Sequence, residues 1–374
     1  MHEIDLVIDG LSYRGWESIM VRRSLEEFER SFSVTYNDRW TERSEIVPIR
    51  KGQAFQVTVD GDVLITGYID DTAIRYDAQQ HTLTAVGRSS VGDLCDCVAV
   101  VASGKKRRWP KGSTIQKIAT ELCSPFSITV GGPTVTDVLR APLAHPFSVE
   151  RGERVFEALS RLADLKGLLL QSTVGGDVVF TRAGTKKVST VLRYGDNIKT
   201  CSYNASDRER FSHYVFRGQS VADDNHNGTA STQIKGFAED AEIKRYRPFE
   251  VTARVQSDKR DLGFRAIWER NTRAGRSETV SYGIRGWTHA DGLWAPNTLV
   301  DVDDRATNLR DTMLISSVTL NASAADGYTA ELELVDRRTY DVVGTPKPKR
   351  KVQPRPKTLD QPSVPAFILW EPGK

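Results

Sequence analysis

Two stretches of this sequence carry the same succession of a strand, a long strand and a third strand, joined by polar turns. Alternation of apolar and polar residues predicts strands with one buried face. The six segments are Phe55 to Val59, Val63 to Ile69, His81 to Val86, Leu299 to Val302, Met313 to Leu320 and Tyr328 to Val335. A small antiparallel barrel is the natural way for such strands to bury their apolar face. From the patterns alone, an internal repeat and two unrelated meanders both remain open.

The length of 374 residues predicts two to four domains, because single hydrophobic cores stop growing well before this size. Apolar spacing predicts helices over about residues 113–123 and 153–166, and Gly175-Gly176 predicts a hairpin after them. The expected fold class is a β-rich α+β protein with two similar small antiparallel barrels. The expected parts are a first barrel (1–100), an α+β domain (101–195), a second barrel (196–222 and 277–342), an inserted loop and helix (223–276) and a flexible tail (343–374).

The second barrel is expected to include a strand from His213 to Phe216, followed by an exposed loop from Asp223 to Gly228. An amphipathic helix is predicted from about Asp258 to Ala274, and its expected apolar side is Leu262, Ala266, Ile267 and Trp268. Its other side carries Lys259, Arg260, Arg265, Arg270, Arg273 and Arg276. Such a charged face can simply be exposed to solvent. Alternatively, it forms a subunit contact or the wall of a channel. For that alternative the candidate residues are Arg265, Arg270, Arg273 and Arg276.

A corner with two tryptophans precedes the last three strands. Asp291-Gly292 supplies a residue that can adopt positive φ, and Pro296-Asn297 makes a second bend. The rings of Trp287 and Trp294 either cover the end of a barrel or offer a surface for stacking sugars. The candidate structural residues of this corner are Trp287, Asp291, Gly292, Trp294, Pro296 and Asn297.

The pattern Trp-x-x-x-Asp-Gly-x-Trp-x-Pro-Asn, followed by a strand, resembles the baseplate hub proteins of contractile-tailed phages of the Mu and T4 types. These proteins are related to the hub part of type VI secretion spike proteins. Further segments match in the expected order: Gly15 to Glu26, Gly67 to Asp70, Val86 to Ser89, Glu153 to Leu159 and Asp207 to Tyr214. The similarity runs from about Leu11 to about Val335 and leaves out the loop around Asp223 to Glu242.

The resemblance implies a structural protein in the tail baseplate of a virion, made in the cytoplasm of the host bacterium. In such hubs each chain carries two similar barrels, so a homotrimer presents six barrels around a ring. A ring of this kind can match a six-fold tail tube on one side and a three-fold spike on the other. The implied partners are therefore other copies of the chain, the central spike, the tail tube and other baseplate proteins. DNA would pass through the ring only in transit.

A search for chemistry finds no H-E-x-x-H, G-x-S-x-G, Walker or dinucleotide-binding pattern. The six histidines lack metal-ligand spacing, and no run of about 20 apolar residues predicts membrane insertion. We therefore expect no enzyme activity, no catalytic, cofactor or metal residues and no cofactor. The alternative is a tail-associated protein that binds the cell wall or degrades peptidoglycan, because glycoside hydrolysis needs only two carboxylates across a cleft. The four cysteines are expected to be free thiols.

The net charge of +3 is unevenly distributed. Residues 343–374 hold seven Lys/Arg against two Asp/Glu, a net +5, so the rest of the chain carries −2. Seven prolines in the same segment predict an extended tail, whose apolar end Phe367, Ile368, Leu369 and Trp370 is a candidate anchor for a partner or simply a disordered end. Nucleic-acid binding by this basic tail would be salt-sensitive and independent of sequence.

Overall fold

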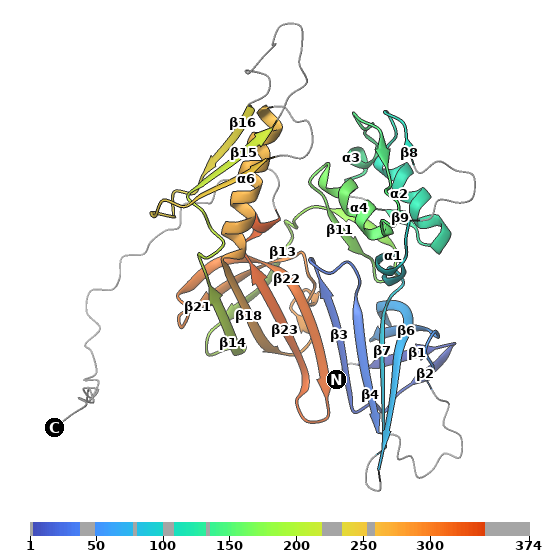
Figure 1. Cartoon of the computed structure of the whole chain (residues 1–374). Helices are drawn as coiled ribbons and strands as arrows, with labels where there is room; N and C mark the ends of the chain where they lie inside the picture. Colours follow the sequence, from blue (N-terminus) through green and yellow to red (C-terminus); the bar gives the residue numbers. More distant parts are fainter. Residues whose placement is uncertain are drawn as a thin grey trace, which may run out of the picture. The chain divides into compact units, whose positions relative to one another are not determined.

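The computed structural model describes residues 3–37, 49–77, 81–99, 108–131, 135–218, 234–252 and 259–340 (Figure 1). All of these described residues belong to one compact unit. The predicted loop at Asp223 to Gly228 and the candidate anchor at Phe367 to Trp370 lie outside the described residues.

Seven strands form the N-terminal part of a large sheet. They are β1 (Ile4–Ile8), β2 (Leu11–Tyr13), β3 (Ser18–Ser24), β4 (Ser31–Asn37), β5 (Ala54–Val59), β6 (Asp62–Tyr76) and β7 (His81–Ser89). Their spatial order is β2-β1-β5-β6-β7-β4-β3, and all neighbours are antiparallel. Alternate residues of β1, β3 and β5 are buried, as their period-2 pattern predicts, so one face of the sheet supplies the core.

Six strands form the C-terminal part of the same sheet. They are β13 (Lys187–Arg193), β14 (Ile198–Ala205), β18 (Glu278–Arg285), β21 (Leu299–Asp304), β22 (Leu309–Ser323) and β23 (Gly327–Val335). Their order is β13-β21-β22-β23-β18-β14, with a short 3₁₀ turn, η3 (Arg337–Thr339), after β23. The sequence predicts residues 187–193 within the α+β domain. Instead, β13 pairs in parallel with β21, and its Val188 and Leu192 belong to the core of the sheet.

The two parts of the sheet repeat one another strand for strand. β5, β6 and β7 have 6, 15 and 9 residues, and β21, β22 and β23 have the same three lengths. Each long strand has one bulge against the strand that follows it, at Asp70 in β6 and at Ser316 in β22. The six predicted strand segments are confirmed. Equal lengths and equivalent bulges favour an internal repeat over two unrelated meanders. The ladders make one 13-stranded sheet, and they do not show closed barrels.

A separate α+β domain follows β7. Its helices are α1 (Gly92–Asp96), α2 (Ile115–Cys123), α3 (Thr136–Arg140) and α4 (Val155–Asp164), with the 3₁₀ turn η1 (Ser124–Phe126). Its strands are β8 (Arg108–Trp109), β9 (Val130–Gly131), β10 (Phe147–Ser148), β11 (Leu169–Ser172) and β12 (Val178–Thr181). The two predicted helices and the predicted β11–β12 hairpin are confirmed. On α4, Val155, Leu159 and Leu162 are fully buried, as the helical spacing predicts.

The insert between β14 and β18 has its own small core. β15 (His213–Gly218) lies between β16 (Ile234–Glu239) and β17 (Pro248–Thr252), and α6 (Lys259–Arg276) runs along β15 and β16 (Figure 1). The predicted strand at residues 213–216 is real, but its place in the second barrel is wrong. Because β15 pairs only with β16 and β17 among the described strands, it belongs to the insert.

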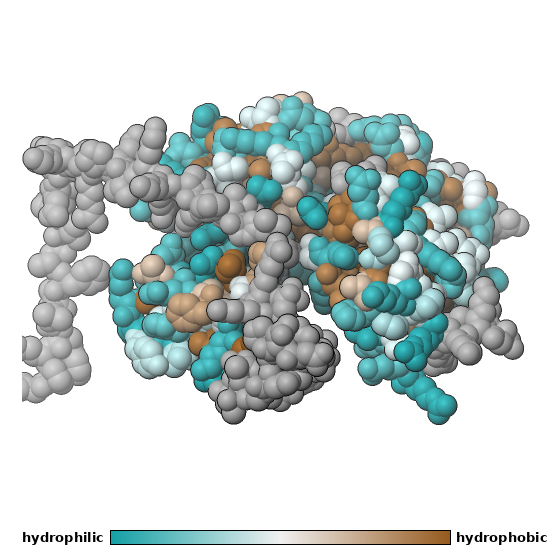
Figure 2. Space-filling view, turned by 90° about the horizontal axis from the view of Figure 1, so that it is seen from above, coloured by the Kyte–Doolittle hydropathy of each residue, from teal (hydrophilic) through white to brown (hydrophobic). Residues whose placement is uncertain are grey.

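The buried face of α6 differs from the predicted one at a single tryptophan. Leu262 and Ala266 are fully buried, whereas Trp268 is 40% exposed. A helix turns by about 100° per residue, so Trp268 points roughly 200° away from Ala266. In the view of Figure 2, hydrophobic residues show between hydrophilic ones and do not form one continuous face. No helix in the described part of the chain is long and apolar enough to span a membrane.

Candidate functional site

The two repeats of the sheet meet where β3 pairs with β22. The antiparallel register runs from Ser24 opposite Ser317 to Ser18 opposite Ser323. Within it, Val21 lies opposite Leu320 and Ile19 opposite Ala322, and all four of these side chains are buried. Backbone pairing and apolar burial therefore join the repeats into one continuous sheet.

Two neighbouring arginines of β3 contact the second repeat across this junction, one on each face of the sheet. Arg23 is 7% exposed, and its Nη2 donates a hydrogen bond to the carbonyl oxygen of Trp294 in the second repeat. Burial lowers the pKa of Arg23 to about 9, which still leaves it charged at neutral pH. Arg22 lies 3.4 Å from Glu333 of β23 and 3.0 Å from Glu27. The junction is thus held by charged side chains in addition to the strand pairing.

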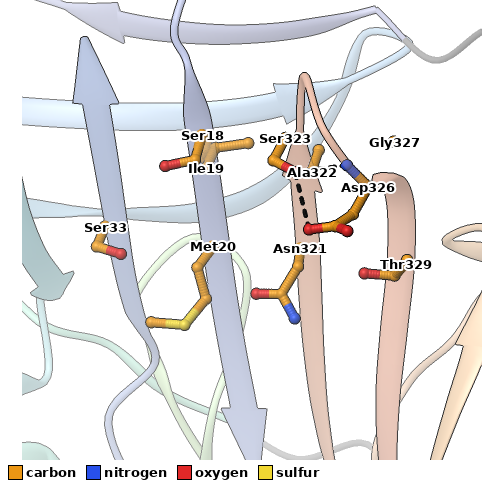
Figure 3. A pocket seen from close by; sticks show the side chains of 10 residues that line it. All are labelled: Ser18, Ile19, Met20, Ser33, Asn321, Ala322, Ser323, Asp326, Gly327 and Thr329. Carbon is orange, nitrogen blue, oxygen red and sulfur yellow. Dashed lines mark hydrogen bonds between the residues drawn. The ribbon is translucent and has the colours of Figure 1, made fainter. Parts of the chain in front are cut away.

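A surface hollow lies across the same junction (Figure 3). It is lined by Ser18, Ile19, Met20, Ser33, Asn321, Ala322, Ser323, Asp326, Gly327 and Thr329. Met20 and Asn321 are directly opposite each other in the ladder. The Ser323 hydroxyl lies 3.3 Å from the Asp326 carboxylate, which closes the β22–β23 turn. The lining is mixed polar and apolar and contains one carboxylate, so the hollow offers no pair of acidic groups for glycoside hydrolysis.

The predicted tryptophan corner packs against the junction. Trp287 is 0% and Trp294 2% exposed. The Trp287 indole Nε1 donates to the carbonyl oxygen of Asn321 at 2.8 Å, and the ring meets Tyr328 edge-on at 5.6 Å. The Trp294 ring packs 4.6 Å from the His289 ring, whose pKa is lowered by burial. Stacking on a sugar needs an exposed ring face, so the proposal that these two rings bind carbohydrate is wrong.

The remaining corner residues hold the turn itself. Two short strands, β19 (Thr288–His289) and β20 (Gly292–Leu293), flank it. Asp291 accepts hydrogen bonds from the backbone and hydroxyl of Ser189 in β13, at 2.7 and 2.8 Å. Gly292 and Asn297 adopt φ of 131° and 65°, as the two predicted bends require. The Asn297 side chain bridges Gly184 and Arg182, and Pro296 precedes it in the bend. The corner therefore ties the chain before and within β13 to the second repeat.

The four candidate arginines of α6 differ in their surroundings. Arg265 is exposed. Arg270 bonds to Asn271 and to the Glu239 carbonyl oxygen, and Arg276 lies 3.2 Å from Glu26.

Arg273 has the densest contacts of the four. It pairs with Glu269 at 2.7 Å and with Glu209 at 3.1 Å, and its guanidinium stacks over the rings of Phe211 and Phe249. Three of the four arginines thus make contacts inside the chain. A role in a subunit contact or a channel wall stays a prediction.

One polar cluster has no counterpart in the sequence-based expectations. Arg88 of β7 binds Asp70 at 2.7 Å, Asp96 of α1 at 2.7 Å and Glu29 at 3.1 Å. Hydrogen bonds from Arg88 hold the pKa of Asp96 below its ordinary value. Asp70 is the bulge residue of β6, so the cluster ties the bulge to the first helix of the α+β domain. Asp96, Asp70 and Glu29 lie 8, 18 and 59 positions from Arg88, and these separations follow no local pattern that could have predicted the cluster.

Groups that could hold a metal ion are absent from the described residues. The four cysteines are free, with Cys123 buried and Cys97 and Cys201 exposed.

Comparison with known proteins finds three family models of baseplate proteins that match separate parts of the chain. Residues 3–89 match the family model of the Mu phage baseplate assembly protein GpP-like N-terminal domain. Residues 91–182 match the second domain of the baseplate hub protein gp44-like family. Residues 259–341 match the fourth domain of the Mu phage baseplate assembly protein GpP. These limits follow the first repeat, the α+β domain, and α6 with the part of the second repeat from β18 to β23.

Individual relatives agree with the family models. The baseplate hub protein gp44 of Escherichia phage Mu is 32% identical over 344 residues, which covers 90% of this chain and 88% of that protein. A 43 kDa tail protein of prophage MuSo2 from Shewanella oneidensis is 33% identical with a TM-score of 0.80, over 91% of this chain and 99% of that one. A tail protein from Neisseria meningitidis MC58 shares the fold, with a TM-score of 0.76 and 22% identity over 91% and 99% of the two chains.

Proposed function

This chain belongs to the family of Mu-type baseplate hub proteins, and we propose that three copies of it form the ring that joins a six-fold tail tube to a three-fold central spike. The family membership rests on 32% identity across 90% of the chain and gives the protein a structural role in a phage tail baseplate. The ring, the spike contact and the passage of DNA through the opening go beyond that membership.

The internal repeat is the observation that best supports a trimer. Each chain holds two equivalent sets of strands with lengths of 6, 15 and 9 residues and with equivalent bulges. Three copies then present six similar surfaces in a ring, which can bind a six-fold tube, while the α+β domains and inserts repeat three times. A closed cyclic assembly satisfies both symmetries without different subunits.

The net charge of the chain outside its basic tail is compatible with DNA passing through the ring. Outside the basic tail the chain carries about −2, so a channel through the ring has no general excess of positive charge to hold phosphates. Arg265, Arg270, Arg273 and Arg276 remain candidates for a subunit contact or for the channel wall. The candidate anchor from Phe367 to Trp370 is assigned to the spike or to a neighbouring baseplate protein.

Both tryptophans of the corner, Trp287 and Trp294, are buried and offer no ring face to a sugar, which argues against a protein that binds the cell wall or degrades peptidoglycan. Nor does the hollow at the junction bring two carboxylates together. We therefore favour a role in baseplate assembly and propose that the protein acts without catalysis.

The mass of the purified full-length chain in solution tests the proposal. Three copies of a 41.7 kDa chain have a mass of about 125 kDa, and native mass spectrometry or light scattering at micromolar concentration should give that value. A stable monomer, or a particle of four or six copies, would contradict the trimeric ring.

A further inference from the structure

Two arginines face each other at the end of the β3–β4 hairpin. The ladder between these strands ends with Arg22 opposite Ser31, and one residue further the same register brings Arg23 opposite Arg30. Directly opposite side chains in an antiparallel pair project to the same face, with Cβ atoms about 4.5–5.5 Å apart. The positive charge of Arg30 therefore acts on Arg23 at short range.

Arg23 continues a row of buried apolar side chains. On β3, Ile19 and Val21 point to the same face as Arg23 and are 2% and 0% exposed, and Arg23 itself is 7% exposed. Its opposite residue on β22, Val318, is fully buried. A guanidinium group thus stands where the alternation of the strand places a core side chain. A charge in such a position needs a partner of opposite sign.

The acceptors that bind these two arginines are uncharged. Arg23 Nη2 donates to the carbonyl oxygen of Trp294. Arg30 Nη1 donates to the carbonyl oxygen of Leu64 at 3.0 Å, and Arg30 Nη2 donates to that of Ser172 at 2.7 Å. Neutral carbonyl groups satisfy some of the N–H donors, but they leave the two positive charges uncompensated.

Two buried N–H groups beside the arginines have no acceptor among the described residues. They are Nε of Arg23 and the indole Nε1 of Trp294. The two residues are neighbours, because the Trp294 carbonyl group accepts from Arg23. A buried donor without an acceptor loses the hydrogen bond that it makes with water in the unfolded chain. A water oxygen would satisfy these donors, whereas an anion would satisfy them and also compensate the charge.

Other arginines of the described chain show what a carboxylate partner does. Hydrogen bonds with Asp96 and Asp70 raise the pKa of Arg88. Burial and the charge of Arg30 instead lower the pKa of Arg23 to about 9, and burial lowers that of Arg30 to about 10. The described arginines whose pKa is raised are Arg14, Arg22, Arg88, Arg210, Arg217 and Arg338. Arg23 and Arg30 are set apart from them because neither has an acidic partner in the described part of the chain.

We propose that Arg23 and Arg30 together hold one small inorganic anion of the chloride type as a part of the folded chain. Arg23 Nε and Trp294 Nε1 donate hydrogen bonds to the anion, and Arg30 supplies the second positive charge. Arg30 is only partly buried, which gives a free ion a path from solvent. Because Arg23 is 7% exposed, such an ion reaches it more readily than a side chain of another protein does.

The anion would connect three parts of the chain. Arg23 belongs to the first repeat, and Trp294 belongs to the corner of the second repeat. Arg30 binds Ser172 of β11 in the α+β domain. The stability of the place where these parts meet should therefore depend on the concentration of small anions. This dependence is a property of the single chain and does not rest on the trimeric ring.

Urea denaturation of the full-length chain, with chloride replacing the bulky anion gluconate at constant ionic strength, tests the site. In the wild type, each tenfold increase in chloride above the dissociation constant should raise the ratio of folded to unfolded chains about tenfold. R23M removes the charge, keeps a long side chain and should abolish this dependence. The matched control is R22M, because Arg22 lies on the other face of β3 and pairs with Glu27 and Glu333. R22M should keep the chloride dependence of the wild type. Equal chloride dependence of the wild type and R23M would overturn the site.

A crystal structure of the wild-type chain grown with bromide in place of chloride locates the ion directly and decides the question even if R23M does not fold. We expect an anomalous peak within hydrogen-bond distance of Arg23 Nε and next to the guanidinium group of Arg30. A water molecule or a carboxylate of the chain in that position, or bromide at exposed surface sites alone, would contradict the proposal.

Discussion

Ile74 in β6 occupies the position that Leu320 occupies in β22, yet Ile74 is 57% exposed and Leu320 is 0% exposed. The two residues share a strand length, a bulge and a place after that bulge. Their difference in burial has one visible source, because β3 covers Leu320 and no described strand covers Ile74. Among the described strands, the two repeats therefore differ in what covers the half of the long strand beyond the bulge.

The tryptophan corner should be essential to the fold. Trp294→Ala removes a buried ring from the junction, so the free energy of unfolding should fall by about 3–5 kcal/mol, and the yield of assembled protein should fall with it. Urea denaturation followed by circular dichroism measures the loss. Trp268→Ala is the matched control, because that ring is 40% exposed, and it should change stability by less than about 1 kcal/mol. Equal effects of the two substitutions would contradict the assigned packing.

Arg273 should stabilise the insert locally. Arg273→Ala removes two ion pairs and two ring contacts from a side chain that is 22% exposed, which should cost about 1–2 kcal/mol. Hydrogen exchange should accelerate in β15, β17 and α6 and remain unchanged in the large sheet. Arg265→Ala, on an exposed part of the same helix, should have little effect on exchange. If Arg265→Ala alone prevents assembly, that residue lies in a subunit contact.

Asp304 should make the second repeat sensitive to acid. Burial raises the pKa of this fully buried carboxyl group, but hydrogen bonds from the Ala306 amide at 2.8 Å and the Tyr282 hydroxyl at 2.9 Å outweigh burial and leave the pKa below its ordinary value of 3.8. A depressed pKa in the folded state contributes stability above the unfolded pKa. That contribution is lost as the pH falls through the folded value.

The free energy of unfolding measured between pH 7 and pH 2 tests this assignment. The wild-type protein should lose stability below about pH 4, and Asp304→Asn should lower stability at pH 7 and flatten the acid limb. Asp303→Asn is the control, because its ion pair with Arg310 is half-exposed and should contribute little. An unchanged acid limb in Asp304→Asn would refute the role of Asp304.

The six strand segments of the two repeats could be predicted from the sequence because alternation within Phe55 to Val59 or Tyr328 to Val335 is local, but the patterns left open whether the segments form a repeat. The helices 113–123 and 153–166 were predictable for the same reason. The corner residues were also found, since positive φ at Gly292 and Asn297 has a direct sequence signal. The burial of both tryptophans decided between the two interpretations of that corner, and burial depends on distant partners such as Asn321 and Tyr328.

Other features depend on which strands meet, and no local pattern states that. The strand at residues 213–216 was recognised, but its partners β16 and β17 come from the later part of the insert. β13 was assigned to the wrong domain because its partner β21 lies about a hundred residues away. The β3–β22 junction joins segments that are nearly three hundred residues apart, so no local pattern predicts it.

The tail remains a prediction from composition. Deleting Pro346 to Lys374 should leave the melting temperature and the mass per trimer nearly unchanged apart from the missing residues, because prolines and charges deny this segment a core of its own. Binding to the spike, measured by co-purification, should fall. Replacing Phe367 to Trp370 with four serines should reproduce the loss of binding, and aggregation of the truncated chain would show that the tail belongs to the folded body.

A cryo-electron microscopy reconstruction of the purified full-length protein, calculated without imposed symmetry, tests the central claim most directly. We expect a three-fold ring with six similar strand units around an axial opening. A monomer or a dihedral particle would contradict the trimeric ring.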